Sequence, residues 1–184
     1  KSRPAMSEYH TPVLLDESVS ALISSTSGTY ADATFGGGGH TSEILRRLSP
    51  EGRVVSFDRD SDAIRNRPED SRLTLIRSDF RWIHNHLINE GYRNGIDGIL
   101  ADLGVSSHQF DTADRGFSFR YDAPLDMRMN QEAEMTAADI LNTYEQEDIE
   151  RIMRLYGEVE NSRKIAQMIC KARENAPVST TSDL

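Results

Sequence analysis

Four consecutive glycines, residues 36–39, constrain the fold of this chain more than any other feature of its sequence. A strand is predicted before them, over Thr29–Thr34, and a helix after them, over His40–Leu48. Glycines let the backbone approach a ligand closely, and the start of a helix offers N–H groups that have no partner within the helix. We therefore expect a strand–loop–helix unit with a ligand at the loop, rather than a flexible glycine-rich hairpin.

Strand and helix patterns keep alternating around this unit. Further strands are predicted over Arg53–Asp58, Arg72–Ile76 and Ile96–Asp102. Further helices are predicted over Asp16–Ser25, Ser61–Asn66 and Arg81–Glu90. Strands that alternate with helices in this way form a parallel sheet with helical crossovers, so the predicted fold class is α/β.

The pattern changes after the fourth strand. Residues 103–130 are rich in Gly, Asp and Arg, and a loop of this length in a compact domain is usually functional or disordered. Three helices are then predicted, over Thr136–Asn142, Glu147–Tyr156 and Asn161–Glu174. We expect two domains: an α/β core over residues 8–130 and the start of an all-helical subdomain over residues 131–184.

Composition narrows the function classes. Of 184 residues, 37% are hydrophobic, and no apolar stretch approaches the roughly 20 residues that span a bilayer, so we expect no membrane protein. The first residues do not resemble a secretory signal, which favours the cytoplasm. The single cysteine, Cys170, excludes an internal disulfide. A formal charge of −9 argues against nonspecific coating of nucleic acid, so a nucleic-acid partner would need a local basic patch.

Acidic residues stand at the carboxyl ends of the predicted strands, which meet at one edge of a parallel sheet. Asp58 lies about 20 residues after the glycines, where an acidic side chain accepts hydrogen bonds from ribose hydroxyls; its alternative role is to cap the next helix. Asp79 can accept an exocyclic amine, and Phe80 can cover an adenine face or belong to the core. With Asp32 and Asp102, these residues predict one nucleotide-binding site.

The glycine spacing bears on which nucleotide is bound. Gly36 and Gly38 fit the dinucleotide pattern G-x-G-x-x-G, but Thr41 stands where the pattern needs a third small residue. This departure, and the lack of an evident Tyr-x-x-x-Lys, weaken the alternative of an NAD-dependent oxidoreductase.

Four motifs follow one another along the chain. They are Thr34-Phe-Gly-Gly-Gly-Gly-His40, Asp102-Leu-Gly-Val-Ser-Ser-His-Gln109, Asp114-Arg-Gly-Phe-Ser-Phe119 and Pro124-Leu-Asp-Met-Arg-Met129. In this order they resemble the ribosomal RNA small-subunit methyltransferase H family (MraW/RsmH), and Tyr9-His-Thr-Pro-Val-Leu-Leu-Asp-Glu17 resembles its N-terminal signature. The resemblance runs from about residue 8 to the end.

The resemblance implies a fold, a cofactor and a substrate. The fold is a Rossmann-like methyltransferase core, with a parallel sheet that is incomplete in this chain, interrupted by an inserted helical subdomain. The cofactor is S-adenosylmethionine. The substrate is 16S rRNA in the small ribosomal subunit, methylated on the N4 amine of a cytosine in the decoding centre.

The resemblance also carries over seven site residues: Gly38, Gly39, His40, Asp58, Phe80, Asp102 and Gln109. It implies that the two glycines and the histidine line the methionine end of the cofactor, that Asp58 holds the ribose, and that Phe80 flanks the adenine. The last two residues close the site. Contacts from Asp32, Gly36 and Asp79 are predicted from position alone.

The proposed chemistry requires a hydrogen-bond acceptor. An exocyclic cytosine amine is a poor nucleophile because its lone pair is delocalised into the ring, so the enzyme must hold that nitrogen in line with the methyl group. Asp102 is the candidate acceptor and the predicted catalytic residue. The cytosine must also leave its stack, and Phe117, Phe119 and Met127 either cover it or merely anchor the loop.

A basic stretch, residues 151–173, is the candidate RNA contact, with a solvated helix face as the alternative. Its cations are Arg151, Arg154, Arg163, Lys164, Lys171 and Arg173. We expect no metal, because His84 and His86 diverge on a helix and methyl transfer needs none.

The number of predicted strands leads to two further expectations. A methyltransferase sheet of this type has seven strands and only four are predicted, so we expect a fragment of a longer protein. Because of the unpaired edge on the fourth strand, we expect this fragment to self-associate, to pair with a separate chain that carries the missing strands, or to be only marginally stable. A cofactor-binding module that does not catalyse stays open as an alternative.

Overall fold

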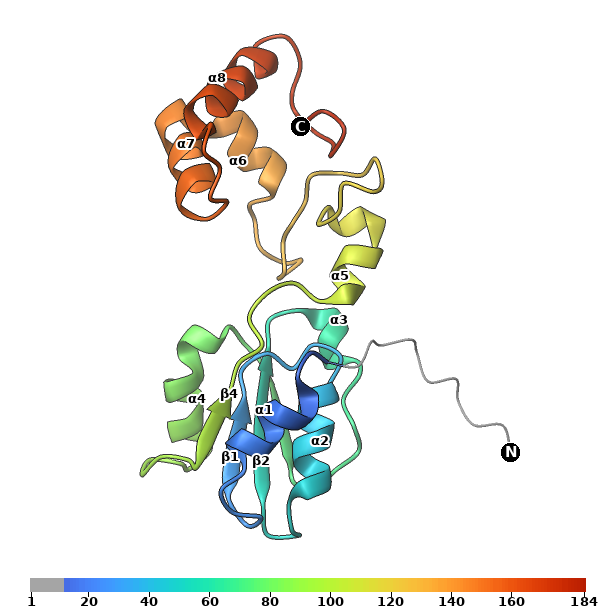
Figure 1. The fold of residues 1–184 in the computed structure, drawn as a ribbon, viewed down its shortest axis with the longest axis vertical. Helices are drawn as coiled ribbons and strands as arrows, with labels where there is room; N and C mark the ends of the chain where they lie inside the picture. Colours follow the sequence, from blue (N-terminus) through green and yellow to red (C-terminus); the bar gives the residue numbers. More distant parts are fainter. Residues whose placement is uncertain (1–11) are drawn as a thin grey trace, which may run out of the picture. The chain divides into compact units, whose positions relative to one another are not determined.

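In the computed structural model, which describes residues 12–184, four parallel strands form one sheet in the order β3-β2-β1-β4 (Figure 1). The strands are β1 (Thr29–Asp32), β2 (Arg53–Asp58), β3 (Leu73–Arg77) and β4 (Gly98–Leu100). The chain adds strands to one side of β1 and then returns to pair β4 with its other side. The predicted α/β class with a parallel sheet is confirmed.

Helices cover both faces of this sheet. On one face lie α1 (Leu15–Leu22) and α2 (Gly39–Arg47), and on the other lies α4 (Ile83–Asn89) (Figure 1). Two short elements, α3 (Ser61–Ile64) and the 3-10 helix η1 (Phe80–Trp82), follow β2 and β3. None of the helices within residues 12–184 is long and apolar enough to cross a membrane.

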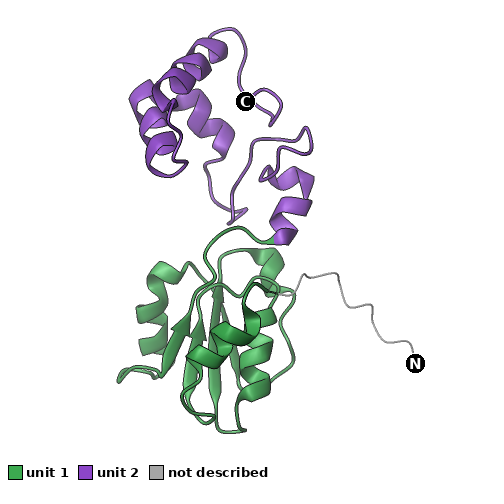
Figure 2. Cartoon of the chain, in the orientation of Figure 1, with its two compact units in different colours: residues 1–106 green, residues 107–184 purple. Residues whose placement is uncertain are grey.

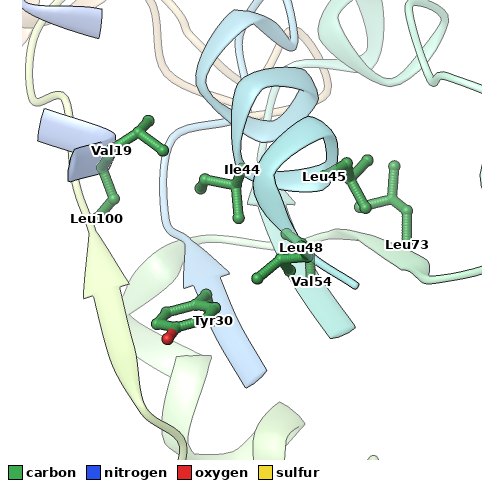
Figure 3. Packing of buried hydrophobic residues seen from close by; sticks show 8 residues of the cluster. All are labelled: Val19, Tyr30, Ile44, Leu45, Leu48, Val54, Leu73 and Leu100. Atoms are coloured by element: carbon green, nitrogen blue, oxygen red, sulfur yellow. The ribbon is translucent and has the colours of Figure 1, made fainter. Parts of the chain in front are cut away.

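The period-two alternation of the strands builds a core on each face. Tyr30 and Val54 point to the α1/α2 side and pack with Ile44 (Figure 3), whereas Ala31 and Val55 point to the α4 side. All five are fully buried. Burial of an aliphatic side chain of this size contributes about 1.5–3 kcal/mol, so these layers fix the position of the strand ends.

The chain divides into two compact units, residues 1–106 and residues 107–184 (Figure 2). The second unit contains α5 (Ser107–Asp111), the 3-10 helix η2 (Ala113–Arg115), α6 (Ala137–Thr143), α7 (Gln146–Leu155) and α8 (Ser162–Arg173). Thr136 begins α6 with a capping box, because its hydroxyl accepts from the Asp139 N–H while the Asp139 carboxylate accepts from the Thr136 N–H. The hydrophobic core of the second unit includes Leu141, Ile149 and Ile169.

Backbone pairing holds the loop of the second unit against residues 179–181, which follow α8. The Leu125 N–H donates to the Ser179 carbonyl at 2.9 Å, and the Thr181 N–H donates to the Ala123 carbonyl at 2.9 Å. Buried Arg115 donates to the Arg128 carbonyl at 3.0 Å. The predicted loop over residues 103–130 is therefore ordered by these bonds and includes α5 and η2.

Most predicted elements are present with boundaries shifted by one to three residues; for example, the helix predicted over Asp16–Ser25 ends at Leu22, and the strand predicted over Thr29–Thr34 ends at Asp32. The fourth strand, predicted over Ile96–Asp102, is shorter because the Asp102 N–H bonds to a threonine side chain instead of a neighbouring strand. The units divide at residue 106, whereas the predicted domains, residues 8–130 and 131–184, divide at residue 130. The predicted domain assignment stays a prediction.

Candidate functional site

The glycine loop joins the end of β1 to the start of α2. The Phe35 N–H donates to the Phe57 carbonyl at 2.9 Å, and the Gly38 N–H donates to the Phe35 carbonyl at 2.7 Å. Gly38 is the N-cap of α2 and has a φ of 79°. A Cβ atom there would lie 2.9 Å from the Phe35 ring, so the turn requires glycine.

Asp58 fastens this loop to the end of β2. Its Oδ2 accepts from the Gly36 N–H at 2.8 Å and its Oδ1 accepts from the Asp60 N–H at 2.8 Å. Partial burial raises the pKa of Asp58, and the bonds from Asp60 and Gly36 oppose that change. The cap of α3 is Asp60, which accepts from the Asp62 N–H, so Asp58 is not the helix cap.

Asp32 lies inside the unit. Its side chain is fully buried and accepts from the Thr34 N–H at 3.0 Å and from the Thr41 hydroxyl at 2.7 Å. Burial raises the pKa of this carboxyl. The predicted cofactor contact of Asp32 stays a prediction.

Asp79 and Phe80 follow β3. The Asp79 carboxylate accepts from the Arg81 N–H and lies 3.2 Å from both the Arg59 and the Arg81 guanidinium groups. Burial alone would raise the pKa of Asp79, but the hydrogen bonds from Arg81 and the two positive charges lower it. Phe80 is 44% exposed, so its ring does not belong to the core and can cover a ligand.

Asp102 and His40 come together next to the glycine loop. The Asp102 side chain is 45% exposed, and its Oδ2 lies 4.0 Å from His40 Nδ1. His40 is buried, and within residues 12–184 its Nε2 has no hydrogen-bond partner. A buried ring nitrogen without a partner costs free energy, so a bound ligand atom at this position would stabilise the site.

Gln109 is the one predicted site residue in the second unit, where it is buried in α5. Its predicted contact with the cofactor stays a prediction. The other nine predicted site residues, Asp32, Gly36, Gly38, Gly39, His40, Asp58, Asp79, Phe80 and Asp102, all stand at or after the carboxyl ends of strands in the first unit.

Sequence reasoning missed the threonines of the site. Thr41 was noted only as a departure from a dinucleotide pattern, but its hydroxyl bonds to Asp32 and lies 2.7 Å from the Ser56 hydroxyl. Thr34 accepts the backbone N–H of Asp102 at 2.8 Å. The signal in the sequence was a hydroxyl-bearing residue on each side of the glycines: Thr34 is half-buried in the loop, and Thr41 is buried in the first turn of α2.

Two cations of the predicted basic stretch bind other groups of the protein, and the other four are exposed to solvent. Arg173 donates to the carbonyls of Leu141 and Tyr144, and Arg151 pairs with Asp148 at 3.1 Å. The remaining members, Arg154, Arg163, Lys164 and Lys171, are exposed on α7 and α8.

Comparison with known proteins gives a family and close relatives. The model of the MraW methylase family matches residues 7–184. A protein of Bacteroides fragilis named ribosomal RNA small subunit methyltransferase H is 55% identical over 175 residues, which are 95% of this chain and 57% of the relative. Proteins of the same name from Flavobacterium johnsoniae and Christiangramia forsetii are 50% and 48% identical, each over 96% of this chain and 58% of the relative. The chain therefore spans somewhat more than half the length of these relatives.

Proposed function

The chain belongs to the MraW methylase family, and on this premise we propose that it is part of an S-adenosylmethionine-dependent methyltransferase acting on 16S rRNA of the small ribosomal subunit. The proposed target is the N4 amine of a cytosine in the decoding centre. Such a substrate assigns the activity to the cytoplasm. Membership in a methylase family removes the reason for an NAD-dependent oxidoreductase.

One observation carries the proposal. The Asp58 carboxylate binds the glycine loop through Gly36, so the end of β2 and the start of α2 form one rigid corner. Parallel sheets bind nucleotides at such corners, outside the carboxyl ends of the strands. A carboxylate has about four acceptor positions, and the bonds to Gly36 and Asp60 leave some for ribose hydroxyls.

The residues present suit S-adenosylmethionine. Buried His40 Nε2 lacks a partner within residues 12–184 and would meet the polar methionine end beside Gly38 and Gly39. The exposed ring of Phe80 would cover the adenine, with Asp79 near its edge. When bound, this cofactor supplies a methyl group on a positively charged sulfur.

Asp102 is the proposed catalytic residue. Its half-exposed carboxylate accepts a hydrogen bond from the target amine, which orients the nitrogen and stabilises the positive charge that develops on it. His40 faces the same carboxylate from 4.0 Å. Gln109 is proposed to close the site over the cofactor.

The second unit is the proposed RNA-binding part. Exposed cations on α7 and α8 suit phosphates, and Tyr156, at the end of α7, is 83% exposed and suits stacking on an unpaired base. The formal charge of −9 means that this contact is local. It is therefore expected to recognise a shaped ribonucleoprotein surface.

Two measurements on the full-length protein test the proposal. Calorimetric titration with S-adenosylmethionine, and with NAD as the control, tests the cofactor. Transfer of a labelled methyl group to small-subunit particles and to naked 16S rRNA, followed by mapping of the labelled base, tests the reaction. Binding without transfer would point to a non-catalytic module, and absence of binding would refute the proposal.

A further inference from the structure

The hydroxyl of Thr34 links two strand ends that are far apart in the sequence. Its Oγ1 accepts a hydrogen bond from the backbone N–H of Asp102 at 2.8 Å, across 68 residues. Two residues earlier, the Leu100 carbonyl accepts from the Ala33 N–H at 2.8 Å. These two bonds fix the path of the main chain from β4 into Asp102.

Asp32 orients the Thr34 hydroxyl. Its Oδ1 accepts from the Thr34 N–H at 3.0 Å and from the Thr34 hydroxyl at 3.5 Å. A threonine hydroxyl has one proton and two lone pairs. Because a backbone N–H can only donate, one lone pair of the Thr34 oxygen accepts the Asp102 N–H, and the Thr34 proton can turn toward Asp32.

The other oxygen of Asp32 is held by α2 and β2. The Thr41 hydroxyl donates to Asp32 Oδ2 at 2.7 Å, and the Ser56 hydroxyl lies 2.7 Å from the Thr41 oxygen. Since the single Thr41 proton points to Asp32, Ser56 is the donor to Thr41. Every bond of this network therefore runs toward one buried carboxylate.

Burying a polar network of this kind costs free energy, and a hydrophobic core alone does not require it. Asp32, Thr41 and Ser56 are all fully buried. Burial raises the pKa of Asp32, while its bonds to Thr41 and Thr34 oppose the change. Apolar residues of similar volume often replace buried charged groups without loss of stability, so stability alone does not account for the network.

We propose that Thr34 is a positioning residue for methyl transfer. Its hydroxyl fixes the main chain at Asp102. The position of the main chain in turn determines where the Asp102 carboxylate lies relative to the target amine. This inference rests on the proposed function of Asp102. Thr34 acts through Asp102, so its loss slows the transfer without weakening cofactor binding.

The experiment compares variants of the full-length protein. Thr34→Val keeps the shape of the side chain and removes the acceptor, Thr34→Ser keeps the hydroxyl, and Thr34→Ala repeats the removal with a smaller side chain. Thr74→Val is the matched control, because Thr74 is also half-buried and its hydroxyl makes no hydrogen bond within residues 12–184. The readouts are the Kd of S-adenosylmethionine, the single-turnover rate on small-subunit particles, and the hydrogen-exchange rate of the Asp102 amide by NMR.

Thr34→Val and Thr34→Ala should slow the single turnover by about ten- to a hundredfold, since small displacements of a reacting group have effects of this size. The Asp102 amide should exchange faster in both, and the Kd should stay unchanged. Thr34→Ser should restore the rate, and Thr74→Val should behave like the parent. Equal rates for the Ser and Val variants, or an unchanged exchange rate in the Val and Ala variants, would overturn the inference.

Asp102→Asn separates this inference from the function on which it rests. If Asp102→Asn is as fast as the parent, the proposed role of Asp102 is wrong, and the role of Thr34 with it. If Asp102→Asn is slow while Thr34→Val and Thr34→Ala keep the parental rate, only the positioning role is wrong. In the double variant Thr34→Val/Asp102→Asn, the two losses should not add, because both act on one hydrogen bond to the amine.

Discussion

Replacing Asp58 by alanine would remove the acceptor that joins the glycine loop to β2. The carboxylate binds the Gly36 and Asp60 N–H groups, each at 2.8 Å. In the proposed function it also accepts hydrogen bonds from the ribose of S-adenosylmethionine. The Asp58→Ala variant therefore affects both cofactor affinity and fold stability, and the two effects can be measured separately.

The loss of affinity comes from the bonds to the ribose. Hydrogen bonds to a charged group contribute about 1.5–3 kcal/mol, which corresponds to a Kd raised by about ten- to a hundredfold. The loss of the Gly36 bond loosens the same loop and acts in the same direction.

Two terms oppose each other in the effect on stability. Two backbone N–H groups lose their acceptor, which costs about 1–3 kcal/mol for each group that stays buried. Burial raises the pKa of Asp58, so its ionisation costs stability as the pH rises above 3.8 through the folded value, and the cost persists at neutral pH. Alanine removes that cost, so the net loss in the free energy of unfolding at pH 7 should be smaller than the loss of the two hydrogen bonds alone.

Calorimetry on the full-length protein measures the affinity, and thermal unfolding without cofactor measures the stability. Asp70→Ala is the matched control, because it also removes one carboxylate of the first unit. Asp70 pairs with Arg72 at 2.7 Å, which lowers its pKa to about 2. This control should lose stability and keep its affinity. A folded Asp58→Ala variant with the parental Kd would refute the assignment of Asp58 to the ribose.

Three further predictions follow from the structure. Asp102→Asn should keep the fold and the cofactor affinity but slow the single-turnover rate, since an amide is a weaker acceptor than a carboxylate; a parental rate would contradict this. Gly116→Ala should destabilise the second unit by about 2–4 kcal/mol in denaturant unfolding, because its φ is 69° and the new Cβ would collide with the Pro124 carbonyl. Gly95 has a φ of 100°, but a Cβ atom there would meet no other atom within 4 Å, so Gly95→Ala should lower the free energy of unfolding by only about 1–2 kcal/mol. An equal loss in both variants would show that the collision is unimportant. Hydrogen bonds from Arg46 and Arg47 lower the pKa of Glu43 to about 2. Ionised Glu43 therefore contributes stability that is fully present above pH 4.5 and is lost as the pH falls toward 2. Glu43→Gln should therefore lower stability at pH 7 by about 1 kcal/mol and flatten its decline in acid, and a parental pH profile would exclude the ion pair as its source.

The parallel sheet could be predicted because its central strands, β1 and β2, are buried on both faces and their apolar patterns are strong. Arg53–Asp58 was predicted with the observed bounds, since an apolar core of Val-Val-Ser-Phe lies between a turn and an acidic residue. The glycine loop was equally clear. Its φ of 79° at Gly38 is a conformation that few other residues adopt.

Side-chain partners could not be predicted in the same way. Local patterns give no information about a bond between Thr34 and Asp102, because it spans 68 residues. The pairing of Asp79 with Arg59 likewise depends on how β2 and β3 lie side by side. Sequence patterns therefore located the strand ends, and the packing of the strands determined which groups meet there.

The pairing of residues 123–125 with residues 179–181 also sets an order of events during synthesis. The four strands described in the first unit have all been synthesised once Leu100 has left the ribosome, so they can pair early. The second unit cannot complete its backbone pairing until Thr181 has left the ribosome, because Thr181 is the hydrogen-bond partner of Ala123. At about 5–20 residues per second, the growing chain carries an open second unit for several seconds. A chaperone or a pause in translation would act on the chain in this interval.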